Sequence, residues 1–305
     1  MKVLVTGATG QIGKVLVTRL QGEGHDVQPL MLRDARSRGR LPSGLDAVVH
    51  LGGQTNAYVA RADIGADVRD SLVPFVELLA QVSSTQRPPL VILAGTLTQS
   101  VSEQRYAPTT FYDVVKGASQ MYLEQADQEG WVRALTLRLA NVYGGISADD
   151  HEQPRGFLNL CVARALAGQP ITVYGDGSQQ RDYLHVDDVA ALISAAVRSA
   201  GGEAPPGARS FDVGSGKSTL LKEAVALVVA LVSEATGQRT GIMHQPWPAQ
   251  AYPVEARSAF VDPTAVQQAF DWRPETDLST GIRRTIRAYR TSGVLSGLPR
   301  QGSGN

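Results

Sequence analysis

The stretch Gly7-Ala8-Thr9-Gly10-Gln11-Ile12-Gly13 decides the fold of this 305-residue chain. It follows the short strand-like run Lys2 to Thr6 and leads into residues whose apolar members recur at helical spacing: Ile12, Val15, Leu16 and Leu20. The pattern predicts a strand, a tight turn and a helix. Gly7 permits the turn, Gly10 lets main-chain amides approach a pyrophosphate, and Gly13 lets the helix pack on the strand.

A glycine turn at the start of a helix is suited to binding phosphate, because main-chain amides and the helix dipole favour negative charge there. The same residues could form only a turn, since a glycine pattern alone is weak evidence. Their place between a strand and a helix at the N-terminus favours the functional interpretation. We expect a dinucleotide cofactor to contact Gly7, Thr9, Gly10, Gln11, Ile12 and Gly13.

Short apolar runs alternate with helix-period stretches through the first half of the chain. The runs are Val27 to Leu32, Ala47 to Leu51, Leu90 to Ala94 and Leu135 to Leu139, and the helical stretches are Ser71 to Val82 and Lys116 to Gln128. This alternation predicts an α/β fold with a doubly wound parallel sheet of the Rossmann type. After Tyr143-Gly144-Gly145 the pattern changes, which indicates a second, smaller α/β substrate domain.

The two domains are expected to interleave along the chain. The dinucleotide-binding domain would comprise residues 1–145, with returns at about 184–198 and 209–235. The substrate domain would comprise residues 146–183 and 236–291. Residues 292–305 have too little apolar content to fold alone and would form a flexible tail.

The composition is that of an ordinary soluble enzyme, with 43% hydrophobic residues and 29 basic against 29 acidic residues. No basic excess indicates a nucleic-acid partner. The sequence shows no charged leader, and no apolar run approaches the roughly 20 residues of a membrane span. We expect a cytoplasmic protein without a membrane partner. Its scattered histidines predict no metal site.

Three residues could carry proton chemistry. Tyr112 and Lys116 lie four residues apart on a predicted helix, so both project from one face. An ammonium beside a phenol lowers the phenol's pKa, and such a tyrosine can act as acid and base near neutral pH. Thr96 ends an apolar strand, where an open parallel sheet binds its ligands. Each feature alone is common in structural roles, and their combination with the glycine turn favours catalysis.

Several motifs in order resemble the extended short-chain dehydrogenase/reductases of the nucleotide-sugar epimerase/dehydratase type. Besides the glycine turn and the Tyr112–Lys116 pair, they are Val48-Val49-His50-Leu51-Gly52-Gly53, Leu137-Arg138-Leu139-Ala140-Asn141-Val142-Tyr143-Gly144 and Val173-Tyr174-Gly175-Asp176-Gly177-Ser178-Gln179-Gln180-Arg181-Asp182-Tyr183. The resemblance covers nearly the whole chain. Within the family, it is closest to the dTDP-4-keto-6-deoxyhexose ketoreductases.

The resemblance implies a role for each matching residue. Thr96 would orient the reacting carbonyl or hydroxyl, Tyr112 would exchange the proton, and Lys116 would hold the nicotinamide ribose and tune Tyr112. Leu51, Gly52 and Gly53 would contact the cofactor. Asn141, Arg181 and Arg257 would face the sugar diphosphate, to which guanidinium groups are well suited.

Departures from the family pattern bear on the reaction. Family 4,6-dehydratases follow the threonine with an Asp-Glu pair, whereas this chain has Leu97 and Thr98 and so lacks that acid and base. Met31 stands where NAD-preferring members place an acid, and Arg33 follows it. An arginine there favours the 2'-phosphate of NADP(H) over NAD(H). The alternative is that Arg33 belongs to a solvated, charged loop. Asp67 stands about where the family often has asparagine.

These features predict an NADPH-dependent reductase that transfers a hydride to the keto carbon of a nucleotide-linked, dTDP-type 4-keto-6-deoxyhexose. Two alternatives remain open: an NAD-dependent nucleotide-sugar 4-epimerase that uses the same residues, and a non-catalytic dinucleotide-binding regulator. The family resemblance also predicts a homodimer through the helix that bears Tyr112 and Lys116 together with the helix before it. The apolar residues that could form its contact are Leu72, Val76, Leu79, Met121 and Leu123.

Overall fold

The computed structural model describes residues 1–31, 41–82, 87–99, 108–146, 154–202 and 209–292. The chain divides into two compact units. Unit 1 comprises residues 1–140, 190–213 and 262–273, and unit 2 comprises residues 141–189, 214–261 and 274–305. The predicted tail lies outside the described residues, except for Ser292.

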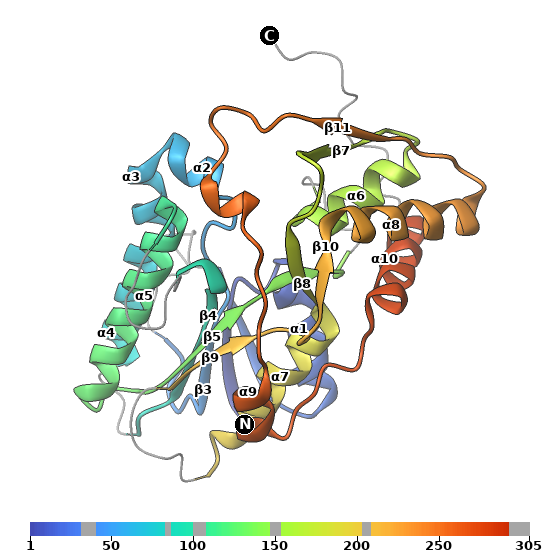
Figure 1. The fold of residues 1–305 in the computed structure, drawn as a ribbon. Helices are drawn as coiled ribbons and strands as arrows, with labels where there is room; N and C mark the ends of the chain where they lie inside the picture. The colour runs from blue at the N-terminus through green and yellow to red at the C-terminus, as the bar shows by residue number, and fades with distance from the viewer. Residues whose placement is uncertain (32–40, 83–86, 100–107, 147–153, 203–208, 293–305) are drawn as a thin grey trace. The chain divides into compact units, whose positions relative to one another are not determined.

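Unit 1 is built on one parallel sheet in the order β2-β1-β3-β4-β5-β9 (Figure 1). The strands are β1 (Lys2–Thr6), β2 (Asp26–Leu30), β3 (Ala47–His50), β4 (Leu90–Thr96), β5 (Arg133–Leu139) and β9 (Arg209–Val213). The order reverses between β1 and β3, which is the switch point where such sheets bind ligands. The predicted fold class, a doubly wound parallel sheet, is confirmed.

Helices cover both faces of this sheet (Figure 1). One face carries α4 (Val73–Val82) and α5 (Phe111–Gln128), and the other carries α1 (Gln11–Gly22) and the C-terminal part of α7 (Val186–Ser199). The side chains between α4, α5 and the sheet form an apolar core that includes Phe75, Leu123 and Leu93. Shorter elements are α2 (Ala57–Ala62), α3 (Ile64–Asp67), a π-helical turn (Val68–Leu72), a 3-10 turn (Leu97–Gln99) and α9 (Thr264–Phe270).

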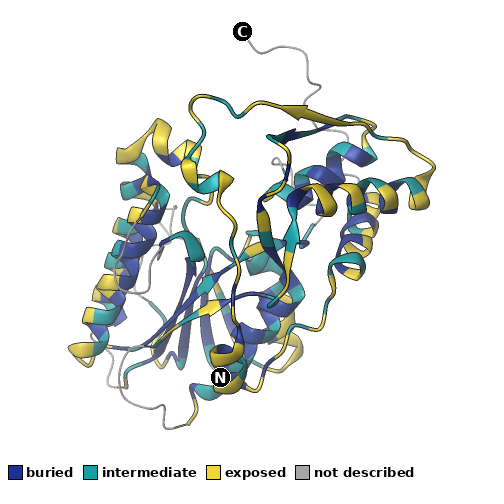
Figure 2. Cartoon of the chain, in the orientation of Figure 1, coloured by how far each residue is buried: buried dark blue, intermediate teal, exposed yellow. Residues whose placement is uncertain are grey.

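Unit 2 has two small sheets and its own core. The sheets have the orders β10-β8-β6 and β11-β7. Their strands are β6 (Asn141–Tyr143), β7 (Ile171–Tyr174), β8 (Gln180–His185), β10 (Ser218–Leu220) and β11 (Ile242–Gln245), and the longer helices are α6 (Phe157–Leu166), α8 (Leu221–Thr236) and α10 (Leu278–Ser292). Figure 2 shows the buried faces of the three helices, which share one apolar cluster.

The two units divide the chain differently from the predicted domains, most extensively at residues 214–235 and 262–273. Residues 214–235 were expected in the first domain, but α8 belongs to unit 2 because its Val225 and Val228 pack in the cluster of α6 and α10. Residues 262–273 were expected in the substrate domain, but they belong to unit 1. There, Phe270 of α9 packs edge-on against Phe211 of β9, with ring centroids 5.7 Å apart. The roles assigned to the two domains remain predictions.

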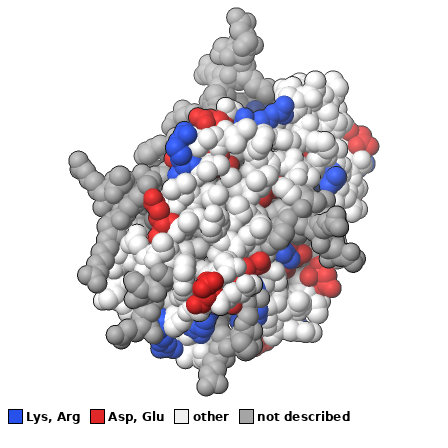
Figure 3. All heavy atoms as spheres, turned by 90° about the vertical axis from the view of Figure 1, so that its left-hand side faces the viewer, with Lys and Arg blue, Asp and Glu red and all other residues white. Residues whose placement is uncertain are grey.

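The outward face of α4 and α5 is largely uncharged (Figure 3). The predicted contact residues Leu79 and Leu123 do not lie on it, because both are buried in the core of unit 1. Met121 is exposed as expected. Other exposed apolar side chains of these helices are Val73, Phe111, Val114 and Tyr122. The homodimer itself stays a prediction.

Gly13 provides a test of how tightly the glycine turn is packed. A Cβ added at Gly13 would lie 2.7 Å from the main-chain Cα of Ala8, whereas one at Gly22 of the same helix would meet nothing within 4 Å. We expect Gly13→Ala to lower the free energy of unfolding by about 1–3 kcal/mol through overpacking. Gly22→Ala should leave it unchanged or raise it by up to about 1 kcal/mol. Urea unfolding measures both, and equal effects would contradict the packing argument.

Candidate active site

The glycine turn and the end of β3 meet at the switch point. Thr6 is paired with His50, so Gly7 and Leu51 follow their strands at the same edge of the sheet. Gly7 has φ +68°, and a Cβ there would lie 2.7 Å from the carbonyl carbon of Leu51 and 2.8 Å from the amide nitrogen of Gly52. Only glycine fits this close approach. The structure thus brings together two segments that were predicted to hold the cofactor.

The N-terminus of α1 has the features of a phosphate site. Its N-cap is Gly10, and within the described residues no side chain caps it and its first turn holds no acid. Gln11 and Ile12 are half-buried, whereas Thr9 is exposed with its hydroxyl 4.0 Å from the sulfur of Met31. This contact brings the end of β2 to the turn. Arg33, the residue expected to select NADP(H), lies outside the described residues.

Thr96, Tyr112 and Lys116 gather at the carboxyl end of β4. Thr96 is the last residue of that strand, and α5 begins at Phe111, so Tyr112 and Lys116 occupy its first two turns. Tyr112 is a hydrogen-bond neighbour of Thr96. The Lys116 Nζ donates to the Ala94 carbonyl at 3.0 Å and lies 5.9 Å from the centroid of the Tyr112 ring. The three side chains therefore form one group.

The electrostatics of this group differ from the expectation. The pKa of Tyr112 is raised, mainly by burial and then by the Asp113 carboxylate, and the Thr96 hydrogen bond opposes this only in part. The expected lowering by Lys116 is therefore not met. Burial also lowers the pKa of Lys116 to about 8, although Asp67 opposes this shift. Near neutral pH, Tyr112 holds its proton and can donate it.

Two further buried groups interact electrostatically with Lys116: the Asp67 carboxylate and the His50 imidazole. Ser71 donates a hydrogen bond of 2.9 Å to Oδ1 of Asp67, while Oδ2 has no hydrogen-bond partner among the described residues. Burial raises the pKa of Asp67. His50 shares a hydrogen bond of 2.8 Å with Thr6, and burial followed by Lys116 lowers its pKa to about 3, so His50 is neutral.

Thr98 and Asp113 are site residues to which sequence reasoning gave no role. The Thr98 hydroxyl lies 3.0 Å from the Thr96 hydroxyl and donates to Oδ1 of Asp113 at 2.5 Å. Asp113 is almost fully buried and forms a capping box with Thr110 at the start of α5. The capping box could have been predicted from the sequence, because Thr110-x-x-Asp113 has the required spacing. Nothing in the sequence shows that the Thr98 hydroxyl bonds to the Asp113 carboxylate.

The three residues expected to face the sugar diphosphate lie in unit 2. Asn141 on β6 donates from Nδ2 to the Asp182 carbonyl at 3.1 Å. Arg257 is exposed and follows the 3-10 turn Pro253–Ala256. Arg181 on β8 donates to the main-chain carbonyls of Gln180, Glu255 and Arg257. Its guanidinium thus holds the segment that carries Arg257, and a direct phosphate contact by Arg181 stays a prediction.

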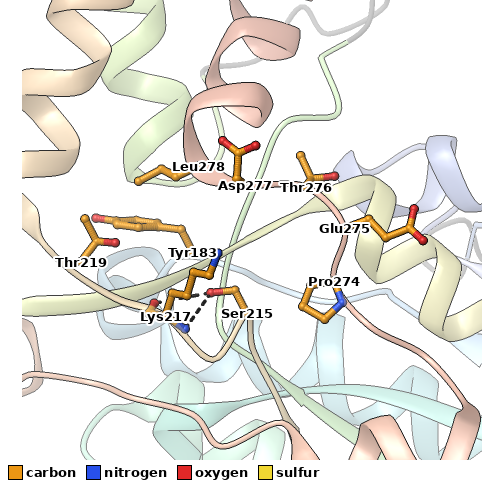
Figure 4. A pocket seen from close by; sticks show the side chains of 9 residues that line it. All are labelled: Tyr183, Ser215, Lys217, Thr219, Pro274, Glu275, Thr276, Asp277 and Leu278. Atoms are coloured by element: carbon orange, nitrogen blue, oxygen red, sulfur yellow. Dashed lines mark hydrogen bonds between the residues drawn. The ribbon is translucent and has the colours of Figure 1, made fainter.

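A small cavity of about 130 Å³ lies within unit 2 (Figure 4). Lys217, Glu275 and Asp277 bring charges to it, and the Tyr183 hydroxyl is buried with no hydrogen-bond partner among the described residues. None of the predicted site residues lines this cavity. Its lining consists of Tyr183, Ser215, Lys217, Thr219 and Pro274, Glu275, Thr276, Asp277 and Leu278.

Comparison with known protein families gives the class of this site. The model of the NAD dependent epimerase/dehydratase family matches residues 3–214, which include the glycine turn, Thr96, Tyr112 and Lys116. The chain belongs to this family. It is an enzyme of the epimerase/dehydratase family, which confirms the coarse expectation from the sequence motifs.

Similar family members catalyse more than one reaction. The chain is 29% identical to a UDP-glucose 4-epimerase of Mycolicibacterium smegmatis, over 95% of this chain and 99% of that protein. It is also 29% identical to a dTDP-glucose 4,6-dehydratase of Xanthomonas campestris, over 63% of this chain and 54% of that protein. A solved UDP-glucose 4-epimerase of Thermus thermophilus in complex with NAD is 25% identical, with a TM-score of 0.75 over 95% of this chain and 99% of that structure.

Two further features are absent from the described residues. None of the helices there is both long and apolar enough to span a membrane. The same part of the chain contains no group of three or more His, Cys, Asp or Glu side chains that could hold a metal ion.

The lowered pKa of Lys116 predicts a pH-dependent stability. Between pH 8 and 10.5 the unfolded chain keeps a proton on this lysine that the folded protein has lost, so folded stability rises with pH. Lys116→Met removes this dependence. Relative to the variant, the wild type should gain up to about 3 kcal/mol across the window. Urea unfolding at several pH values measures the difference, with the exposed Lys222→Met as the control for removing a surface lysine. A constant difference between wild type and Lys116→Met would contradict the shift.

Proposed function

We propose that this family member reduces the keto carbon of a nucleotide-linked sugar, with Tyr112 as the proton donor. The observation that carries the proposal is the group at the end of β4, in which Tyr112 holds its proton beside Thr96 and Lys116. A reductase needs an acid at the carbonyl oxygen as the hydride arrives. Among the substrates of this class, the sequence motifs favour a dTDP-linked 4-keto-6-deoxyhexose.

The residues of unit 1 fit a nicotinamide dinucleotide. The Gly7 turn leaves no room for a side chain, and the N-terminus of α1 offers its main-chain amides to a pyrophosphate. When bound, the cofactor supplies or accepts the hydride. Lys116 would hold its ribose, and the segment Leu51 to Gly53 would lie along it. The nucleotide sugar's diphosphate is assigned to Asn141 and Arg257, with Arg181 bracing the latter.

An NAD-dependent nucleotide-sugar 4-epimerase is the second candidate. Its support is the Mycolicibacterium smegmatis epimerase, which aligns over almost its whole length with this chain. The family is described as NAD dependent, and the Thermus thermophilus neighbour contains NAD, which favours NAD over the NADP(H) expected from Arg33. An epimerase would use Thr96, Tyr112 and Lys116 in the same places. The presence of both Tyr112 and Lys116 argues against a non-catalytic regulator.

A substrate and cofactor panel tests the proposal. The enzyme is incubated with dTDP- and UDP-linked 4-keto and 4-hydroxy sugars, each with NADH, NADPH, NAD or NADP, and the products are identified by NMR. We expect net reduction of a keto sugar with consumption of the reduced cofactor. Interconversion of 4-hydroxy epimers without net cofactor consumption would replace the reductase with the epimerase. Tighter binding of NADH than of NADPH would remove the argument from Arg33.

The proposed role of Tyr112 as the acid predicts the effect of removing its hydroxyl oxygen. Tyr112→Phe should lower kcat by about 100- to 10,000-fold, because a general acid acts mainly in the transition state. The dissociation constant of the nucleotide sugar should change little. Tyr122→Phe, on the exposed side of the same helix, is the matched control and should keep wild-type turnover. Cofactor oxidation followed by absorbance measures both. A folded Tyr112→Phe enzyme with near wild-type kcat would show that the proton comes from another group.

A further inference from the structure

Gln99 and Gln120 connect the end of β4 to α5 through a chain of buried amide groups. The Thr96 amide donates to Gln99 Oε1 at 3.0 Å, and Gln99 Nε2 donates to Gln120 Oε1. Gln120 Nε2 then donates to Oε1 of Glu124 at 2.6 Å. Gln99 is 0% exposed and Gln120 is 2% exposed. The last main-chain amide of the strand is therefore paired by a side chain that is itself anchored on the helix.

The two ends of this chain fix the direction of its hydrogen bonds. A main-chain amide can only donate, and the carboxylate oxygen at the other end accepts. Both glutamines must therefore turn their oxygen toward Thr96 and their nitrogen toward Glu124. Each bond of the chain then has one donor and one acceptor, so the buried amides are satisfied without a contact between like groups.

Gln120 lies on the stripe of α5 that carries the proposed catalytic side chains. Tyr112, Lys116 and Gln120 recur at intervals of four residues, which places them on one face of the helix. Gln99 belongs to the 3-10 turn that directly follows Thr96. The chain of amides therefore joins the turn after Thr96 to the helix that positions Tyr112.

Gly95 shows how closely Gln99 is fitted against the strand. A Cβ added at Gly95 would lie 2.8 Å from Gln99 Oε1 and 3.3 Å from Gln99 Cδ. Gly95 does not have a positive φ, so its backbone conformation does not require glycine. A side chain at this position would push the Gln99 oxygen away from the Thr96 amide.

We propose that Gln99 and Gln120 are positioning residues that hold the main chain of Thr96 against α5 and so set the place of its hydroxyl relative to the Tyr112 phenol. They act through Thr96, because their hydrogen bonds run from its amide to the helix. A misplacement of about 1 Å at a reacting centre can cost about 100-fold in rate. The catalytic consequence rests on the proposed function, whereas the position of the Thr96 amide does not.

Turnover and binding of three variants test the catalytic role. Gln99→Met keeps the length of the side chain but removes both of its hydrogen bonds, so kcat should fall about 10- to 100-fold. The dissociation constants of cofactor and nucleotide sugar should change little. Gln120→Met should lower kcat less, because the bond from Thr96 to Gln99 remains. Gln125→Met is the matched control, since it removes an exposed glutamine of α5 that bonds to Glu129 at 2.9 Å, and it should keep wild-type turnover.

The stoichiometry of cofactor binding separates positioning from general destabilisation. A merely structural role would lower the fraction of molecules that bind cofactor and leave kcat per binding site unchanged. A folded Gln99→Met enzyme with near wild-type kcat per site would overturn the proposal. Gly95→Ala provides the same test if Gln99→Met does not fold, because its methyl group displaces the Gln99 oxygen and keeps every polar group. We expect a similar loss of kcat, and wild-type kcat in this variant would also overturn the proposal.

Amide hydrogen exchange followed by NMR tests the link without a substrate. The Thr96 amide should exchange about tenfold faster or more in Gln99→Met and Gly95→Ala than in wild type, as expected for the loss of one hydrogen bond. The Leu93 amide, inside the same strand, is the reference. A wild-type Thr96 amide that exchanges as fast as an unpaired loop amide would overturn the proposal, even if neither variant folds. If no nucleotide sugar is turned over, the proposed function fails, and the exchange rates still decide whether Gln99 holds Thr96.

Discussion

The buried carboxylate of Asp113 is the constraint on which the geometry of the site depends. Asp113 caps the first turn of α5. Its carboxylate accepts from the Thr110 amide, and the Thr110 hydroxyl accepts from the Asp113 amide. The same carboxylate holds Thr98, just beyond the end of β4. One group therefore fixes the start of the helix that carries Tyr112 and the turn that follows Thr96. The Asp113 carboxylate thus holds the hydroxyl of Thr98, beyond β4, and that of Thr109, before α5. Its burial is tolerated because both of its oxygens are hydrogen bonded.

The same anion acts against the ionisation of its neighbour. Asp113 and burial both raise the pKa of Tyr112, whereas Lys116 has itself lost part of its tendency to be charged through burial. Asp67 attracts the Lys116 charge, yet one of its oxygens has no partner among the described residues. Such partly satisfied buried groups cost stability and are characteristic of active sites. The arrangement keeps a protonated phenol at the end of β4.

Much of the fold could be predicted because local patterns determine it. The β1 and α1 positions followed from apolar spacing and the glycine turn, and the i, i+4 spacing placed Tyr112 and Lys116 together. The start of α4 was less predictable. Ser71 was expected to begin it, but a π-helical turn spans Val68–Leu72. In that turn the Ser71 hydroxyl donates to Asp67 and accepts from the amide of the distant Gln54.

Side-chain partners across distant segments could not be read from the sequence. The motif of Arg181 indicated a phosphate ligand, whereas its guanidinium bonds to carbonyls more than 70 residues away. A local sequence pattern cannot predict hydrogen bonds between residues so far apart in the chain. The link from Thr98 to Asp113 is of the same kind, since the two residues come from different elements. Sequence spacing thus indicated candidate site residues, while their hydrogen-bond partners depended on folding.

The position of Asp113 also bears on why elimination of water is a poor fit for this site. The family resemblance places an acidic pair directly after the threonine in the dehydratases, and here those positions hold Leu97 and Thr98. Asp113 is the carboxylate linked to Thr96 through Thr98, but it is 1% exposed and accepts four hydrogen bonds. A carboxylate so enclosed cannot reach a sugar ring to move a proton. It is held instead by Thr98 and by the capping box at the start of α5.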